Sequence, residues 1–274
     1  MAENPPSLPP SPPPGDGASG APGGGAPGGV PSPGGAGRDG TALPEGVPCW
    51  TDVQLPDLEA GKRFYGGLFG WTFEEVSGSV AWARSDGGAV AALVRKRDGR
   101  MPTVWTVYFA TPDAAALAGR IRAAGGQVIV PPAPVDGLGV TMLAADPEGA
   151  VFGLWQAGTH PGFGSRHRPG SFAWAQLYAR DTATANTFYT GLFHDALFGP
   201  GAVPDFGRAP VGEVFPAEMP PHFLVHFGVE DVGAALEAVG RLGGRVRVPP
   251  FETSYGRVVV VADDQGASFA LLRR

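Results

Sequence analysis

An internal repeat constrains the fold of this 274-residue chain more than any other feature. Seven residues recur after a constant offset of 124 positions, which chance rarely produces. They are Trp50, Asp57, Phe64, Tyr65, Gly67, Leu68 and Phe69, repeated as Trp174, Asp181, Phe188, Tyr189, Gly191, Leu192 and Phe193. Later segments match at offsets of 118 and 117, so the second copy is about seven residues shorter. The chain is therefore predicted to contain two versions of one domain.

Composition divides the chain into four segments. Residues 1–46 contain 12 Pro and 13 Gly and almost no aliphatic or aromatic side chains, so they cannot bury enough apolar surface to offset the entropy of ordering. We therefore expect a disordered tail at 1–46, with a Pro-rich docking ligand as the alternative role of this tail. The first copy occupies 47–157, the Gly- and Pro-rich stretch 158–170 is a linker, and the second copy occupies 171–274.

The hydrophobic pattern of each copy predicts a strand, a helix and three strands, followed by the same order again. In the first copy, residues 49–55 alternate as in a half-buried strand, and Asp57 follows as a helix N-cap. The helix runs toward Gly70, which is typical of a helix end. Strands are then predicted at 72–75, 80–84, 89–95 and 103–110, a helix at 113–124, and strands near 128, 141 and 151. The fold class is α+β.

These motifs resemble a known family. The opening aromatic strand followed by Asp, the Phe-Tyr-x-x-Leu-Phe-Gly helix at 64–70 and the Asp-Pro-x-Gly turn at 146–149 are similar to the vicinal oxygen chelate (VOC) superfamily of glyoxalases, extradiol dioxygenases and bleomycin-resistance proteins. The resemblance covers residues 47–274 and is to two-domain, glyoxalase-like members. It implies two tandem VOC domains, each of paired βαβββ modules that form a concave mixed sheet with the helices outside. It leaves the activity open, because this scaffold carries lyases, isomerases, dioxygenases and metal-free binding proteins.

The resemblance also says where a metal would bind. Metal-dependent members hold the ion with His or carboxylate side chains on the opening and closing strands of the two halves. The matching positions are Trp50, Thr106 and Gly153 in the first copy and Trp174, Leu224 and Ala270 in the second, with a less securely aligned fourth position near Ala91 and Glu213. Apart from Glu213, none offers a metal ligand. We therefore expect no metal and no cofactor.

Strand alternation predicts which side chains line the two concave faces, or cups. The inward set of the first copy is Trp50, Asp52, Gln54, Thr106, Tyr108, Gly153 and Trp155, and that of the second is Trp174, Gln176, Tyr178, Leu224, His226, Ala270 and Leu272. Aromatic walls with a few polar groups are typical of small-molecule sites, so the aromatic and polar members are predicted ligand-binding residues. The alternative is that these aromatics fill a closed core or a seam between the copies.

Asp52 is the predicted catalytic residue. A carboxylate among Trp side chains should have a raised pKa and could accept a proton, unless a neighbour on the sheet simply satisfies it. In the second copy, His226 with Glu213 is the one pair suited to acid-base work or a degenerate metal site; a structural His226 is the alternative. Tyr255 and Arg257, in the loop before a strand, could close over a ligand, with an ordinary solvated loop as the alternative. His160 is expected to be exposed in the linker.

Charge and hydropathy exclude several classes of function. The net charge is −6 and the 20 Lys and Arg residues are scattered, so we expect no nucleic-acid partner. No run of 18 apolar residues and no signal-peptide pattern is present, so we expect no membrane association and a cytoplasmic location. Cys49 is the single cysteine, which excludes a disulfide within one chain.

The sequence therefore favours metal-independent binding, or modest acid-base chemistry, of a small and partly aromatic molecule. A metal-dependent lyase or dioxygenase of the superfamily is the first alternative, and a non-catalytic scaffold with no ligand is the second. The sequence leaves open the ligand, catalytic turnover and whether two chains form a homodimer.

Overall fold

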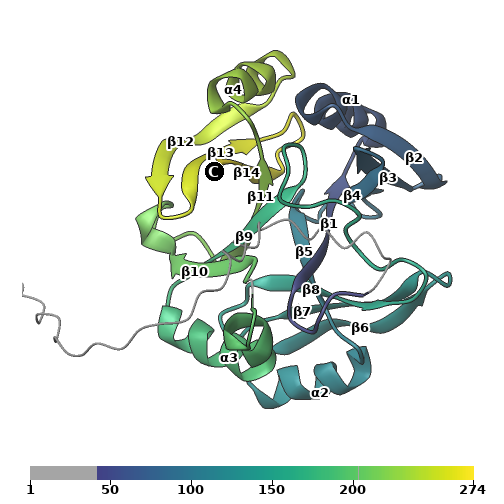
Figure 1. Ribbon diagram of the computed structural model, residues 1–274, viewed down its shortest axis with the longest axis vertical. Helices are drawn as coiled ribbons and strands as arrows, with labels where there is room; N and C mark the ends of the chain where they lie inside the picture. Colours follow the sequence, from purple (N-terminus) through teal and green to yellow (C-terminus); the bar gives the residue numbers. More distant parts are fainter. Residues whose placement is uncertain (1–41, 203) are drawn as a thin grey trace, which may run out of the picture. The chain divides into compact units, whose positions relative to one another are not determined.

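Two mixed β-sheets with helices packed against them make up the part of the chain that the computed structural model describes, residues 42–202 and 204–274 (Figure 1). Most of the predicted tail, residues 1–41, lies outside the described residues. The α+β fold class is confirmed. No helix in the described part of the chain is long and apolar enough to cross a membrane.

The first copy forms a single eight-stranded sheet in the order β2-β3-β4-β1-β5-β8-β7-β6. Its first half contains β1 (Pro48–Leu55), α1 (Leu58–Phe69), β2 (Thr72–Ser77), β3 (Val80–Ser85) and β4 (Gly88–Arg95). Its second half contains β5 (Trp105–Ala110), α2 (Ala114–Ala123), β6 (Gln127–Val135), β7 (Gly139–Ala145) and β8 (Val151–Ala157). Strand β1 runs parallel to β4 and antiparallel to β5, so the two opening strands meet at the centre.

The second copy forms a six-stranded sheet in the order β10-β9-β11-β14-β13-β12. Its elements are β9 (Phe172–Ala179), α3 (Thr182–Phe198), β10 (Phe206–Pro210), the 3₁₀ turn η1 (Val211–Glu213), β11 (His222–Gly228), α4 (Val232–Arg241), β12 (Arg245–Thr253), β13 (Gly256–Ala262) and β14 (Ser268–Arg273). The prediction of three strands after the first helix is wrong for this half, which has one strand and a 3₁₀ turn. Pro216, Pro220 and Pro221 follow this turn, and proline cannot donate to a strand ladder.

An aspartate caps the start of every α-helix in the described residues. Asp57, Asp113, Asp181 and Asp231 each accept a hydrogen bond from a backbone N–H of the first helical turn. Helix α1 ends at Gly70, which has the left-handed φ of 70° that glycine adopts without strain. These caps are the local reason why each opening strand is followed at once by a helix.

The two copies hold each other through a reciprocal pair of hydrogen bonds. The Tyr65 hydroxyl on α1 donates to Asp263 in the β13–β14 turn at 2.8 Å, and the Tyr189 hydroxyl on α3 donates to Asp146 in the β7–β8 turn at 3.2 Å. Helix α1 accordingly lies beside α4, and α2 beside α3 (Figure 1). The repeated tyrosine therefore binds the closing turn of the opposite copy, and one continuous apolar core includes buried residues of both copies.

Candidate functional site

The centre of the first cup is built on β1 and β5. Trp50 pairs with Tyr108 across these strands, and Asp52 pairs with Thr106, while Val53 is fully buried in the core under the helices. Because side chains alternate along a strand, Trp50 and Asp52 lie on the opposite, concave face. Trp50, Tyr108 and Trp155 belong to a cluster of their own, separate from the main core. The structure thus brings the predicted first-cup residues to one face of the sheet.

Asp52 occupies an unusual environment in this cup. The Tyr108 hydroxyl donates a hydrogen bond to Asp52 Oδ2 at 2.7 Å, whereas Asp52 Oδ1 is buried and has no hydrogen-bond partner among the described residues. Burial raises the pKa of Asp52 to about 6, and the hydrogen bond from Tyr108 opposes this rise. An oxygen in this position can accept a hydrogen bond, or a proton, from a bound molecule.

The linker fills part of the first cup, which the sequence did not indicate. The His160 ring lies 4.4 Å from the Trp50 ring and stacks 4.6 Å from the Trp82 ring. Trp155 Nε1 donates to the His160 carbonyl at 2.9 Å, and Phe163 lies 5.7 Å from Trp50. The expectation that His160 is exposed is therefore wrong: its exposed fraction is 7%, because aromatic rings surround it. Burial lowers the pKa of His160 to about 4, so the ring is neutral at pH 7.

The rest of the first cup is accessible. Gln54, Thr106, Trp82 and Leu143 are each only partly buried, so solvent reaches the floor beside Asp52. Trp82 was missed at the sequence level, although the alternation of residues 80–84 predicts a strand with Trp82 on one face. In the sheet, Trp82 pairs with Ala92 and Ala92 pairs with Asp52, which puts all three on the concave face.

Gly153 has a steric role in this cup. A Cβ atom at this position would lie 2.2 Å from the Tyr108 ring, so only glycine allows Tyr108 to lie flat against β8. The absence of a side chain here therefore positions the hydroxyl that holds Asp52.

The residues at the superfamily's metal positions do not fit a metal ion. Trp50 and Thr106 flank Asp52, and the Tyr108 ring covers Gly153. The fourth position, placed near Ala91 from the sequence, falls on the wrong face, because Ala91 is in the main core and Ala92 faces the cup. Across residues 42–202 and 204–274, no group of three His, Cys, Asp or Glu side chains is placed to hold a metal.

The second cup is covered by its own aromatic side chains. Trp174 Nε1 donates to Gln176 Oε1 at 3.0 Å, and the Tyr255 ring stacks on Trp174 at 5.2 Å. The Tyr255 hydroxyl lies 3.4 Å from Gln176 Oε1, and Tyr178 packs against Phe215. The Tyr255 turn thus closes over the cup itself. The inward residues Leu224, Ala270 and Leu272 are buried beneath it.

His226 and Glu213 do not form an acid-base pair. His226 is fully buried, its Nδ1 lies 3.1 Å from the Leu224 carbonyl, and its Nε2 has no partner among the described residues. Burial lowers the pKa of His226 to about 4. Glu213 is exposed on η1, and no hydrogen bond or ion pair of the described residues joins it to His226. The geometry therefore does not favour proton transfer between these two residues.

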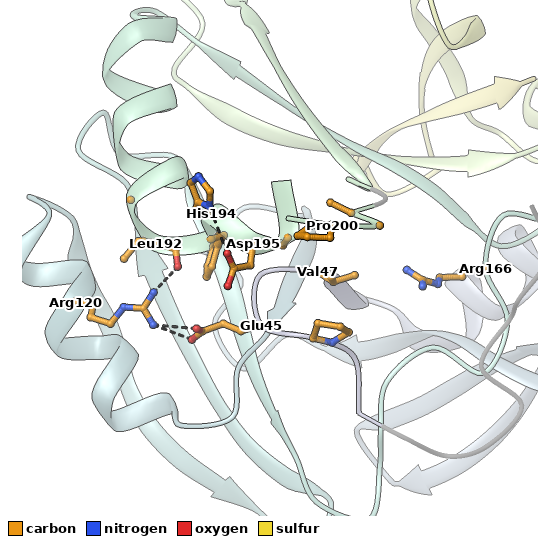
Figure 2. A pocket seen from close by; sticks show the side chains of 14 residues that line it. Glu45, Val47, Arg120, Arg166, Leu192, His194, Asp195 and Pro200 are labelled. Atoms are coloured by element: carbon orange, nitrogen blue, oxygen red, sulfur yellow. Dashed lines mark hydrogen bonds and ion pairs between the residues drawn. The ribbon is translucent and has the colours of Figure 1, made fainter. Parts of the chain in front are cut away.

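A polar cavity of about 580 Å³ lies beside α3, where the helix is kinked at Phe193 (Figure 2). Its most prominent charges pair with each other: Arg120 donates to both carboxylate oxygens of Glu45 at 3.0 Å, and also to the Leu192 carbonyl. His194 and Asp195 are 3.3 Å apart at the rim. Because its charges are already paired, this cavity is a weaker candidate than the cup that contains Asp52.

Comparisons with known proteins agree with this architecture. Residues 50–154 match the model of the Glyoxalase/Bleomycin resistance protein/Dioxygenase superfamily. The chain is 36% identical over 262 residues to the anthracycline biosynthesis protein DnrV of Streptomyces peucetius, covering 85% of this chain and 94% of DnrV. It is 34% identical over 248 residues to the putative glyoxylase CFP32 of Mycobacterium bovis, covering 84% of this chain and 95% of that protein.

Solved structures share the fold at low sequence identity. The Mn(II)-bound glyoxalase from Novosphingobium aromaticivorans has a TM-score of 0.58 at 16% identity, covering 84% of this chain and 82% of its own. Homoprotocatechuate 2,3-dioxygenase from Arthrobacter globiformis has a TM-score of 0.57 at 13% identity, covering 87% and 83%. With its tandem repeat, paired sheets and full-length relatives, the chain belongs to the glyoxalase/bleomycin resistance protein/dioxygenase superfamily.

Proposed function

We propose that this protein binds a small, partly aromatic molecule in the first cup without a metal ion, and that Asp52 is the polar anchor for it. The observation that carries the proposal is Asp52 Oδ1, which is buried without a partner among the described residues, beside Trp50 on an otherwise accessible floor. Leaving a buried carboxylate oxygen unpaired costs stability, and a ligand that donates a hydrogen bond removes that cost.

The walls of the cup suit a flat ligand. Trp82 is partly exposed beside the buried Trp50 and Trp155, and an exposed indole ring binds aromatic molecules by stacking and edge-to-face contact. The ligand should therefore combine an aromatic ring with a hydroxyl or ammonium group that reaches Asp52. The relative DnrV is named an anthracycline biosynthesis protein, so an anthracycline is a reasonable first ligand to test.

Asp52 can also perform modest acid-base chemistry on such a ligand. A carboxylate with a pKa of about 6 is ionised at neutral pH and is a stronger base than an ordinary aspartate. Tyr108, which donates to the other oxygen, holds the carboxylate in place and leaves Oδ1 to accept the ligand's proton.

A scaffold without a ligand is the second candidate. It is favoured by the linker, because His160 and Phe163 already occupy part of the cup. In that case the aromatic cluster would only stabilise the fold, and no ligand would bind in the cup.

The test is a binding titration of the full chain with an anthracycline at pH 8 and at pH 5, in which the fluorescence of the ligand reports binding. We expect saturable binding that is unchanged by a chelator and weakens about tenfold at pH 5, where Asp52 is protonated and no longer accepts the ligand's proton strongly. Asp52→Asn should bind weakly at both pH values, whereas the control Asp98→Asn, at an exposed ion pair with Arg100, should behave as wild type. Absence of saturable binding would favour the scaffold, and binding that requires a divalent cation would refute the proposal.

A further inference from the structure

A second large cavity lies between the two copies, away from the Asp52 cup. Its volume is about 670 Å³, within the usual range for small-molecule sites of about 300–1,000 Å³. The first copy supplies Pro102–Trp105, the loop that enters β5. The second copy supplies Val214–Pro216, Met219, Pro220 and the start of β11 and, from the other side, Arg247 and Val248 on β12. None of these residues belongs to the cluster around Asp52.

Apolar side chains are exposed at the cavity. Val104 is 45% exposed and Met219 is 36% exposed, one on each side of the opening. Pro102, Pro216 and Pro220 also line it, and their restricted backbones reduce the entropy that a bound molecule would have to offset. The surface is therefore apolar and stiff, as expected of a preformed site.

One wall of the cavity is an aromatic stack. The Phe215 and His222 rings meet edge to face at 5.0 Å, and both pack against the buried Tyr178, at 4.9 Å and 5.7 Å. Tyr178 thus supports the two rings from behind, so Phe215 and His222 present a fixed surface to the cavity. Such a surface favours a flat ring system over a flexible chain.

Two polar groups define what else the ligand must carry. Arg247 is exposed at the cavity, and no carboxylate of the described residues lies within ion-pair distance of it. His222 Nδ1 lies 2.9 Å from the Pro220 carbonyl and must donate to it, and burial lowers the pKa of His222. The neutral ring therefore has an unprotonated Nε2 that can accept a hydrogen bond.

We propose that this cavity is a second binding site, which takes a flat aromatic acid that carries a hydroxyl group at a distance from its carboxylate. The Phe215 ring stacks with the ring system, Arg247 pairs with the carboxylate, and the edge of the His222 ring, through Nε2, accepts from the hydroxyl. The site is independent of Asp52, so one protein chain would bind two different molecules.

Three naphthalene probes test this assignment on the full chain: 6-hydroxy-2-naphthoate, 2-naphthoate and 2-naphthol. The fluorescence of each probe measures its binding. Wild type should bind 6-hydroxy-2-naphthoate most tightly. Arg247→Gln should weaken both acids about threefold to fivefold and leave 2-naphthol unchanged, as removal of an exposed ion pair does. Arg245→Gln is the matched control, because Arg245 is an exposed arginine on the same strand and does not line the cavity.

Two further variants separate the contacts. His222→Phe keeps an aromatic ring and should abolish the preference for 6-hydroxy-2-naphthoate over 2-naphthoate. Val104→Trp, at an exposed loop position, should fill the opening and weaken all three probes about tenfold or more. Asp52→Asn should leave all three affinities unchanged, whatever its effect in the first cup.

The outcomes against the proposal are distinct. Equal affinities in Arg247→Gln and Arg245→Gln, or no saturable binding by wild type up to millimolar probe, would overturn it. Weakening by Asp52→Asn but not by Val104→Trp would place the probes in the first cup; this would overturn the second site and support the first.

Discussion

Replacing Asp52 by Asn should stabilise the protein at neutral pH. Burial raises the pKa of Asp52 from 3.8 to about 6, because ionising the carboxyl in the cup costs free energy that it does not cost in the unfolded chain. The rise is about two pKa units at about 1.4 kcal/mol each, so the cost at pH 8 is at most about 3 kcal/mol. The uncharged amide of the Asp52→Asn variant would avoid this cost and still accept the Tyr108 hydroxyl.

The sign of the effect follows from proton binding. Between about pH 4 and pH 6 the folded protein keeps a proton on Asp52 that the unfolded chain has released, so the stability of wild type falls as the pH rises through this window. The new amide must find a partner of its own, which offsets part of the gain. We expect a net gain of about 1–2 kcal/mol at pH 8, or about 2–8 °C in the melting temperature, and almost none at pH 4.

Thermal unfolding of wild type and Asp52→Asn, followed by circular dichroism from pH 4 to pH 8, measures this difference. Contributions from all other titrating groups cancel, because both proteins contain them. Asp98→Asn controls for the loss of one negative charge at an exposed position. A variant that is less stable than wild type at pH 8, or a difference that does not shrink toward pH 4, would refute the reasoning.

The hydrogen bonds of Tyr65 and Tyr189 between the copies give a second prediction. Tyr65→Phe should lower the free energy of unfolding in urea by about 2–3 kcal/mol, because it leaves Asp263 and the Trp105 indole N–H without their buried partner. Tyr189→Phe loses one longer bond and should lower it by about 1–2 kcal/mol, so equal losses would contradict this reasoning. Third, the pKa of His226 is about 4 in the folded protein and 6.5 when the group is free, so the stability it contributes is present above pH 6.5 and is lost as the pH falls toward 4. His226→Leu should therefore flatten the dependence of the unfolding free energy on pH in this window. Fourth, Gly119→Ala on the exposed side of α2, where a Cβ meets nothing within 4 Å, should stabilise by about 0.5–1 kcal/mol in the same assay; a loss would show that α2 needs flexibility there.

Much of the fold could be predicted because its signals are local. Asp57 and Gly70 mark the two ends of α1 by cap chemistry, and alternation along 49–55 assigns Trp50 and Asp52 to one face. The repeat then extended the same interpretation to the second copy. This interpretation was wrong after α3, where the second copy has prolines in place of two strands. The prolines argued locally against those strands, but the similarity to the first copy was given more weight.

The site was only partly predictable for a different reason. The face on which Asp52 lies follows from strand periodicity, but its missing partner at Oδ1 depends on how the Tyr108 ring lies over Gly153 on another strand. His160 was assigned to a solvent-exposed linker from composition, yet neighbouring rings bury it. No local pattern shows which concave surface a linker covers.

Local sequence patterns were enough to assign the two copies, their helix caps and the face of each strand that points into a cup, because the caps and the strand faces depend on residues within a few positions of one another. The bond from Tyr65 to Asp263, which spans 198 positions, and the cavity where Pro102–Trp105 meets β11 and β12 exist only in the folded chain. Both arise from the docking of one copy against the other. Docking depends on the shapes of whole packed surfaces, and no short stretch of sequence encodes those shapes.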